Sequence, residues 1–137
     1  GLGDVYKRQY LFSNSVAPSI VGASIEMFRI LEESNELHDR LMENVAYFRD
    51  KMIAAGFDIK PTQSAICAVM LYDAKLSQDF AAEMQKEGIY VTGFYYPVVP
   101  KDQARIRVQL SAAHTREQLD KAIEAFIKVG KRLNVLK

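Results

Sequence analysis

The sequence contains 137 residues, a length that suits one domain with a hydrophobic core, and its 49% hydrophobic content is that of an ordinary globular protein. The formal net charge is +1 and charges of both signs are interspersed, which argues against nucleic acid or a membrane surface as the main partner. No apolar run approaches the length of a transmembrane helix, and the single cysteine, Cys67, cannot form an internal disulfide. We therefore expect a cytoplasmic protein in which Cys67 is a small buried side chain.

The first residues, GLGDVYKRQ, have no apolar segment of the kind found in a signal peptide. Two interpretations compete for residues 1–9. One is a non-native leader, which we favour for at least residues 1–5, and the other is the remnant of a natural linker. We leave this segment out of the fold.

A first helix is predicted to begin near Pro18, because proline is tolerated in a first turn and Asn14 or Ser15 would be a good N-cap. The helix should run to about Glu33. A helix start with a hydroxyl, an amide and free N–H groups is physically suited to a phosphate, and the alternative is plain capping with no ligand. The expected apolar stripe consists of Ile20, Ala23, Met27, Ile30 and Leu31.

A second helix is predicted at residues 36–55, where apolar residues recur at helical spacing and charged residues fill the opposite face. Gly56 should end this helix, as glycine commonly does. The apolar positions are Leu37, Leu41, Val45, Phe48 and Met52.

Two strands are expected next. Residues 57–60 suit a short strand, which Pro61 limits to the edge of a sheet. The near-continuous apolar run SAICAVMLY at residues 64–72 has the length of a buried central strand.

A third helix is predicted at about residues 77–87, closed by Gly88. Strands follow at residues 89–94 and 104–110. A capping box at residues 115–118 then opens the final helix. This order of elements predicts an α+β sandwich, in which helices pack on one small sheet of mixed or antiparallel topology.

The strand at residues 104–110 alternates with period two, so that Ile106 and Leu110 point to one face and Arg105 and Arg107 to the other. The residues alone favour a solvated basic face. Periodicity does not choose between the two arginines.

The stretch GIYVTGFYYPVVPKDQARIRVQLSAAHT at residues 88–115 resembles the C-terminal domain of the α-oxoamine synthases, a family of fold type I enzymes that depend on pyridoxal 5'-phosphate (PLP). The resemblance covers about residues 10–137. It implies an interdomain helix at residues 10–33 and a small C-terminal domain at residues 34–137. It also implies that Arg107 holds the substrate carboxylate, and that Ser13 and Asn14 reach the cofactor phosphate of the partner subunit in a homodimer.

The form of this stretch implies the family members that condense glycine with acetyl-CoA to 2-amino-3-ketobutyrate and CoA, in threonine and glycine metabolism. Members that form 8-amino-7-oxononanoate, 5-aminolevulinate or sphingoid bases are the alternative. In the family the Schiff-base lysine lies in the large domain, so we expect this chain to be inactive alone. A stand-alone, non-catalytic α+β binding module stays open as a different class.

Three other residues are expected to be structural or solvated rather than catalytic. Lys86 and Lys101 suit the solvated end of a helix and a loop. His114 lies beside Ser111 and Thr115, but no carboxylate close in sequence completes a catalytic triad. We expect it to support the entry of the final helix.

Overall fold

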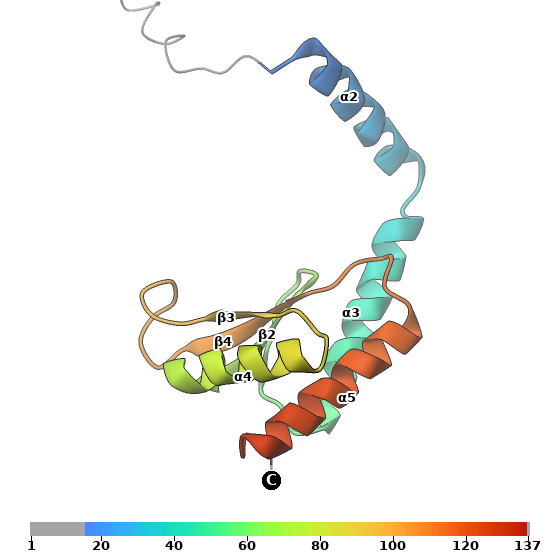
Figure 1. The fold of residues 1–137 in the computed structure, drawn as a ribbon. Helices are drawn as coiled ribbons and strands as arrows, with labels where there is room; N and C mark the ends of the chain where they lie inside the picture. The colour runs from blue at the N-terminus through green and yellow to red at the C-terminus, as the bar shows by residue number, and fades with distance from the viewer. Residues whose placement is uncertain (1–15, 137) are drawn as a thin grey trace, which may run out of the picture. The chain divides into compact units, whose positions relative to one another are not determined.

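The computed structural model describes residues 16–136 (Figure 1), which fall into two compact units divided between Asn35 and Glu36. The segment 1–9 and the predicted phosphate-binding residues Ser13 and Asn14 lie outside the described residues. None of the described helices combines the length and the apolar content needed to cross a bilayer.

The first unit contains helix α2 (Pro18–Glu33), which has Pro18 in its first turn as predicted. Ala17 occupies the N-cap and no side chain caps the helix, so the prediction of Asn14 or Ser15 as the N-cap is wrong. The reason is Pro18 itself, which keeps the residue before it out of the helical region. The predicted apolar stripe is exposed in this structure, for example at Ile20 and Ile30, and no residue of α2 is buried.

The second unit is built on a four-stranded antiparallel sheet in the order β1-β2-β4-β3. Strand β1 (Ile59–Lys60) lies at one edge, β2 (Ile66–Tyr72) and β4 (Ala104–Gln109) are central, and β3 (Thr92–Phe94) forms the other edge. The edge position of β1 and the central position of β2 confirm the predictions. The strand predicted at residues 89–94 is shorter than expected, because only its last three residues pair with β4.

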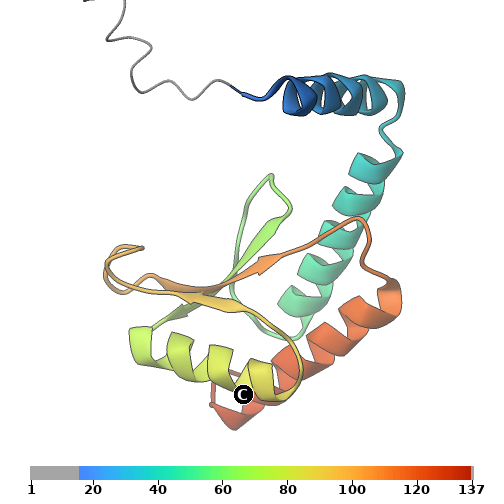
Figure 2. The same cartoon turned by 45° about the horizontal axis from the view of Figure 1, so that its top comes forward.

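Helices α3 (Glu36–Ala54), α4 (Ala74–Lys86) and α5 (Arg116–Arg132) cover one face of this sheet (Figure 1, Figure 2). Helix α3 contacts β1 and β2, α4 contacts β2, β3 and β4, and α5 packs across α3 and α4. The predicted α+β sandwich is therefore confirmed, with an antiparallel sheet. Within this unit the opposite face of the sheet carries no helix.

The core lies between the sheet and the three helices. Alternate residues of β2, including Cys67 and Val69, point into it and are fully buried, as the apolar run predicted. Burial raises the pKa of the Cys67 thiol. Four aromatic rings with neighbouring centroids 5.6 to 6.3 Å apart form the centre: Phe48, Phe57, Phe80 and Phe126.

Side-chain caps fix two helix starts. Thr115 and Gln118 form the predicted capping box of α5. Helix α4, in contrast, begins three residues before the predicted position, because the Asp73 carboxylate accepts a hydrogen bond of 2.7 Å from the backbone N–H of Leu76. Ser77, the predicted first residue, therefore lies inside the helix and is fully buried.

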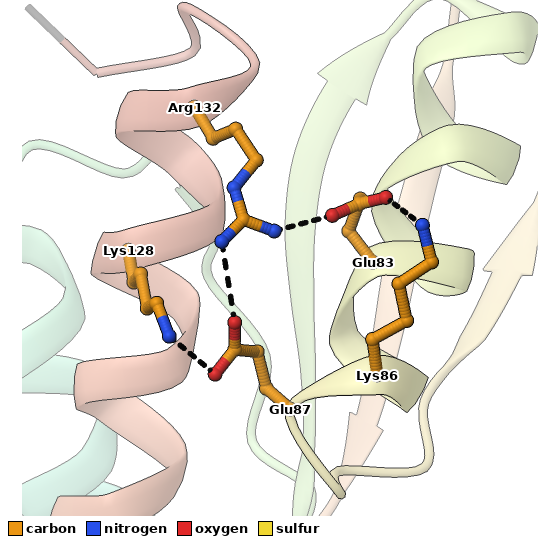
Figure 3. Close-up of polar contacts among 5 residues, drawn as sticks. All are labelled: Glu83, Lys86, Glu87, Lys128 and Arg132. Carbon is orange, nitrogen blue, oxygen red and sulfur yellow. Dashed lines mark hydrogen bonds and ion pairs between the residues drawn. The ribbon is translucent and has the colours of Figure 1, made fainter.

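Ion pairs join the C-terminal ends of α4 and α5 (Figure 3). Glu87 contacts Lys128 at 2.7 Å and Arg132 at 3.4 Å, and Glu83 contacts both Lys86 and Arg132. These hydrogen bonds lower the pKa of both carboxyl groups, with Lys86 the main cause for Glu83 and Lys128 for Glu87. The two glutamates are four residues apart, so they present one acidic edge of α4 to the cations of α5.

Candidate carboxylate-binding site

The sheet face that carries no helix of the second unit, called the uncovered face below, carries two arginines from β4. The β2–β4 register pairs Arg107 with Ala68 and Arg105 with Met70. Residues paired across neighbouring strands share a face, and successive residues of a strand point to opposite faces. Because Ile106 lies in the core cluster, Arg105 and Arg107 point to the uncovered face, as the sequence predicted.

The Arg107 side chain is exposed and lies at a hollow of about 370 Å³. Its guanidinium carbon is 5.5 Å from the ring centroid of Phe94. With the residues that the structure describes, Arg107 makes no hydrogen bond and no ion pair, so its N–H donors are available to a ligand. The hollow contains no acidic side chain that would compete for them; its lining is Tyr90, Val91, Thr92, Phe94, Arg107 and Gln109.

Arg105 is half-buried and is engaged by its own loop. Its Nε donates to the carbonyl oxygen of Gln103 at 3.1 Å, and its Nη2 donates to the Gln103 side chain at 3.4 Å. The two arginines share a face, but only the side chain of Arg105 is hydrogen-bonded to another described residue. Arg107 is therefore the better candidate to bind a carboxylate.

The position of Phe94 depends on a close approach of its strand, β3, to helix α4. An added Cβ on Gly93 would lie 2.9 Å from Ser77 Oγ and 3.0 Å from the Ser77 carbonyl oxygen, so only glycine fits without a shift of the backbone. The Ser77 hydroxyl donates to the carbonyl oxygen of Arg105 at 3.3 Å. Gly93 and Ser77 together hold β3 against α4 beside the arginine strand.

Sequence reasoning missed the contributions of Ser77 and Phe94. The start of α4 was predicted too late, which hid the buried position of Ser77. Phe94 could have been found from the register of the hairpin, since it pairs with Arg105 and is therefore diagonal to Arg107 on the same face.

The remaining candidates have structural partners. Lys86 pairs with Glu83, and Lys101 lies 5.5 Å from the ring centroid of Tyr96. His114 Nδ1 accepts the backbone N–H of Ser111 at 3.1 Å, and its carbonyl oxygen accepts a hydrogen bond from the buried Asn44 at 3.0 Å. His114 thus braces the turn before α5, in agreement with its expected structural role.

Comparison with known proteins identifies relatives along almost the whole chain. It is 59% identical over 129 residues to 2-amino-3-ketobutyrate coenzyme A ligase of Escherichia coli (strain K12), a match that covers 94% of this chain and 32% of that protein. It is 48% identical over 129 residues to 8-amino-7-oxononanoate synthase of Thermosipho melanesiensis, covering 94% of this chain and 33% of the relative. The chain thus spans about a third of the length of these curated relatives.

Solved structures share the fold. Serine palmitoyltransferase from S. paucimobilis with a bound PLP–myriocin aldimine superimposes with a TM-score of 0.85 and is 29% identical, covering 94% of this chain and 33% of that chain. This likeness confirms the predicted fold class, which is that of fold type I PLP-dependent enzymes. The family model described as aminotransferase class I and II matches residues 5–126. The chain therefore belongs to the class I and II aminotransferase family.

Proposed function

We propose that this chain is the C-terminal part of a PLP-dependent glycine C-acetyltransferase, also called 2-amino-3-ketobutyrate CoA ligase, which condenses glycine with acetyl-CoA to 2-amino-3-ketobutyrate and CoA. The identity of 59% to the Escherichia coli ligase supports the acetyl enzyme, whereas the 48% to an 8-amino-7-oxononanoate synthase equals the identity to the human ligase and does not separate the two activities. Family membership favours an enzyme over a stand-alone binding module. The observation that carries the proposal is that the Arg107 guanidinium, on the uncovered sheet face, makes no hydrogen bond or ion pair with the described residues.

In this proposal Arg107 binds the carboxylate of glycine. The guanidinium is charged at every physiological pH and can donate two parallel N–H bonds to the two carboxylate oxygens. A strand holds such a donor pair more rigidly than a loop does. Two bonds fix the orientation of the carboxylate, and with it the direction of the Cα–H bond, which is the geometric requirement for removing that proton.

Pyridoxal 5'-phosphate in the full-length enzyme would supply an electron sink for the charge left on the glycine Cα. The residues of the uncovered face fit a place beside this cofactor, since Arg107 can donate hydrogen bonds to a substrate carboxylate and no acidic side chain lines the hollow to compete for them. The resemblance to the α-oxoamine synthases implies that the lysine linked to the cofactor lies in the large domain, so we assign the covalent link to a lysine outside this chain. Ser13 and Asn14 have the hydroxyl and amide groups to hold the cofactor phosphate across a homodimer interface.

The proposed setting is the cytoplasm and the catabolism of threonine through glycine. A buried free thiol at Cys67 is compatible with a reducing compartment. The proposed partners are therefore glycine, acetyl-CoA and a second subunit of the same enzyme.

Steady-state kinetics of the full-length enzyme test the role of Arg107. With glycine varied at saturating acetyl-CoA, Arg107→Ala should lower kcat/KM by roughly 30-fold to several thousand-fold, because a substrate carboxylate that is buried in the full-length enzyme and loses its charged partner costs about 2–5 kcal/mol. Arg107→Lys should recover only part of the loss, since an ammonium cannot make the paired contact. The affinity for PLP should survive both changes.

Arg105→Ala is the matched control, because Arg105 lies on the same strand and the same face but is bound to Gln103. It should cost much less than Arg107→Ala. If Arg105→Ala were the more damaging change, the assignment of the carboxylate to Arg107 would be wrong. Comparing kcat/KM for acetyl-CoA with that for longer acyl-CoA thioesters would separate the acetyl enzyme from its relatives.

A further inference from the structure

The Phe94 ring lies beside the Arg107 guanidinium. The β3–β4 register pairs Thr92 with Arg107 and Phe94 with Arg105, so the Phe94–Arg107 contact is a diagonal one on the uncovered face. Diagonal neighbours in an antiparallel sheet lie within reach of aromatic and long side chains. The distance of 5.5 Å from the guanidinium carbon to the ring centroid is within the range of about 6 Å for a cation–π interaction.

This contact leaves the donors of Arg107 available. An aromatic ring attracts a guanidinium through its π face and needs none of the N–H hydrogen bonds. A carboxylate binds the edge of the guanidinium through paired N–H groups. Ring and carboxylate can therefore bind the same guanidinium at once, on different parts of it.

The ring itself has a fixed place. Phe94 is half-buried, and the close approach of Gly93 to Ser77 holds its strand against α4. Arg107, in contrast, is exposed and has no hydrogen bond or ion pair to another described residue. Without the ring, the long arginine side chain would sample several rotamers and would lose entropy on binding a ligand.

We propose that Phe94 is a positioning residue, which holds the Arg107 guanidinium at the hollow in an orientation that suits the substrate carboxylate. This inference rests on the proposed function, because it assumes that Arg107 binds the carboxylate of an amino-acid substrate. In this inference the Phe94 ring contributes to the affinity for glycine through Arg107 and does not contact the reacting atoms.

The test uses four variants of the full-length enzyme: Phe94→Leu, Phe94→Tyr, Arg107→Ala and the double variant Phe94→Leu/Arg107→Ala. Phe94→Leu should raise KM for glycine about 2- to 30-fold, the range that corresponds to a cation–π contact, while KM for acetyl-CoA and the affinity for PLP stay unchanged. Phe94→Tyr keeps the ring and should restore KM. In the Arg107→Ala background, Phe94→Leu should have no further effect on KM for glycine.

A structural readout and a control complete the design. Crystal structures should show one orientation of Arg107 with Phe94 or with Phe94→Tyr, and several with Phe94→Leu. Lys101→Met breaks the other cation–ring pair of this stretch, whose distance is also 5.5 Å, and should leave KM for glycine unchanged.

The outcomes separate the inference from the proposed function. An unchanged KM in Phe94→Leu, or an equal rise in KM with and without Arg107, would overturn the positioning role of Phe94 alone. An unchanged kcat/KM for glycine in Arg107→Ala would overturn the proposed function, and the positioning role with it.

Discussion

Gly130 gives the sharpest test of the packing in this fold. It lies inside α5 and is buried against Phe57 and Leu136. A Cβ added at Gly130 would lie 2.8 Å from Phe57 Cζ and 3.1 Å from both Cγ and Cδ1 of Leu136. The helix axis can therefore approach Phe57 only because this position has no side chain.

Two opposing effects set the size of the change in Gly130→Ala. Alanine in a helix interior is favoured over glycine by about 1 kcal/mol. Forcing an extra carbon into a packed core costs about 1–3 kcal/mol. The Phe57 ring cannot move aside easily, because it is 4% exposed and its centroid is 6.3 Å from that of Phe80 and 6.0 Å from that of Phe126. The packing cost should therefore lie in the upper part of its range, about 2–3 kcal/mol, which leaves a net loss of about 1–2 kcal/mol in the free energy of unfolding.

Urea unfolding followed by far-UV circular dichroism measures this difference as a lower midpoint at an unchanged slope. Gly22→Ala is the matched control, because Gly22 is also inside a helix but has no atom within 4 Å of an added Cβ. That change should not lower the midpoint. A Gly130→Ala chain as stable as the parent would refute the close approach of α5 to Phe57.

Three further predictions concern the cofactor and the ion pairs. Changing Ser13 and Asn14 to alanine in the full-length enzyme should weaken PLP binding by a few kcal/mol at most, since a hydrogen bond to a charged group is worth about 1.5–3 kcal/mol; unchanged affinity in equilibrium dialysis would remove that assignment. The present chain, mixed with PLP and reduced with borohydride, should give no stoichiometric pyridoxyllysine in a peptide digest, and a single fully labelled lysine would contradict this. The lowered pKa values of Glu83 and Glu87 stabilise the fold above the ordinary carboxyl pKa of 4.5, and this stabilisation is lost as the pH falls through the lowered values. Glu83→Gln/Glu87→Gln should therefore flatten the dependence of Tm on pH below about 4.5, and an unchanged slope would show that the pairs do not stabilise the fold.

The sequence predicts well those features that depend on local pattern. The apolar run that contains Cys67 has the length of a buried strand and is too short for a typical helix. Pro61 keeps the preceding strand at an edge of the sheet. The capping box at Thr115 needs only two side chains three residues apart. Each of these signals lies within a few residues, so no tertiary contact is needed to interpret it.

Helix starts were less predictable where two signals compete. Asp73 is a strong N-cap, but it directly follows the strand run, and the apolar period alone placed the start of α4 at Ser77. In α2, Asn14 and Ser15 are better capping residues than Ala17, yet the restriction that Pro18 imposes on its predecessor determines the boundary.

The candidate site depends on contacts that the sequence does not encode locally. Alternation along β4 places Arg105 and Arg107 on one face but makes them equivalent. The difference arises because Gln103 folds back to accept two hydrogen bonds from Arg105, and because the hairpin brings Phe94 diagonally to Arg107. The structure distinguishes the hydrogen-bond partners of the two arginines, whereas the assignment of the carboxylate to Arg107 rests on the family resemblance.

The uncovered face also explains why function and stability should be separable here. Arg107 is exposed and has no hydrogen bond or ion pair within the described residues, so its removal creates no cavity in the core and leaves no buried partner unpaired. Surface changes of this kind usually alter the free energy of unfolding by less than about 0.5 kcal/mol. A large loss of kcat/KM in Arg107→Ala at unchanged stability therefore reports on ligand binding, whereas an equal loss in Gly93→Ala would be ambiguous, since that change displaces β3 from Ser77.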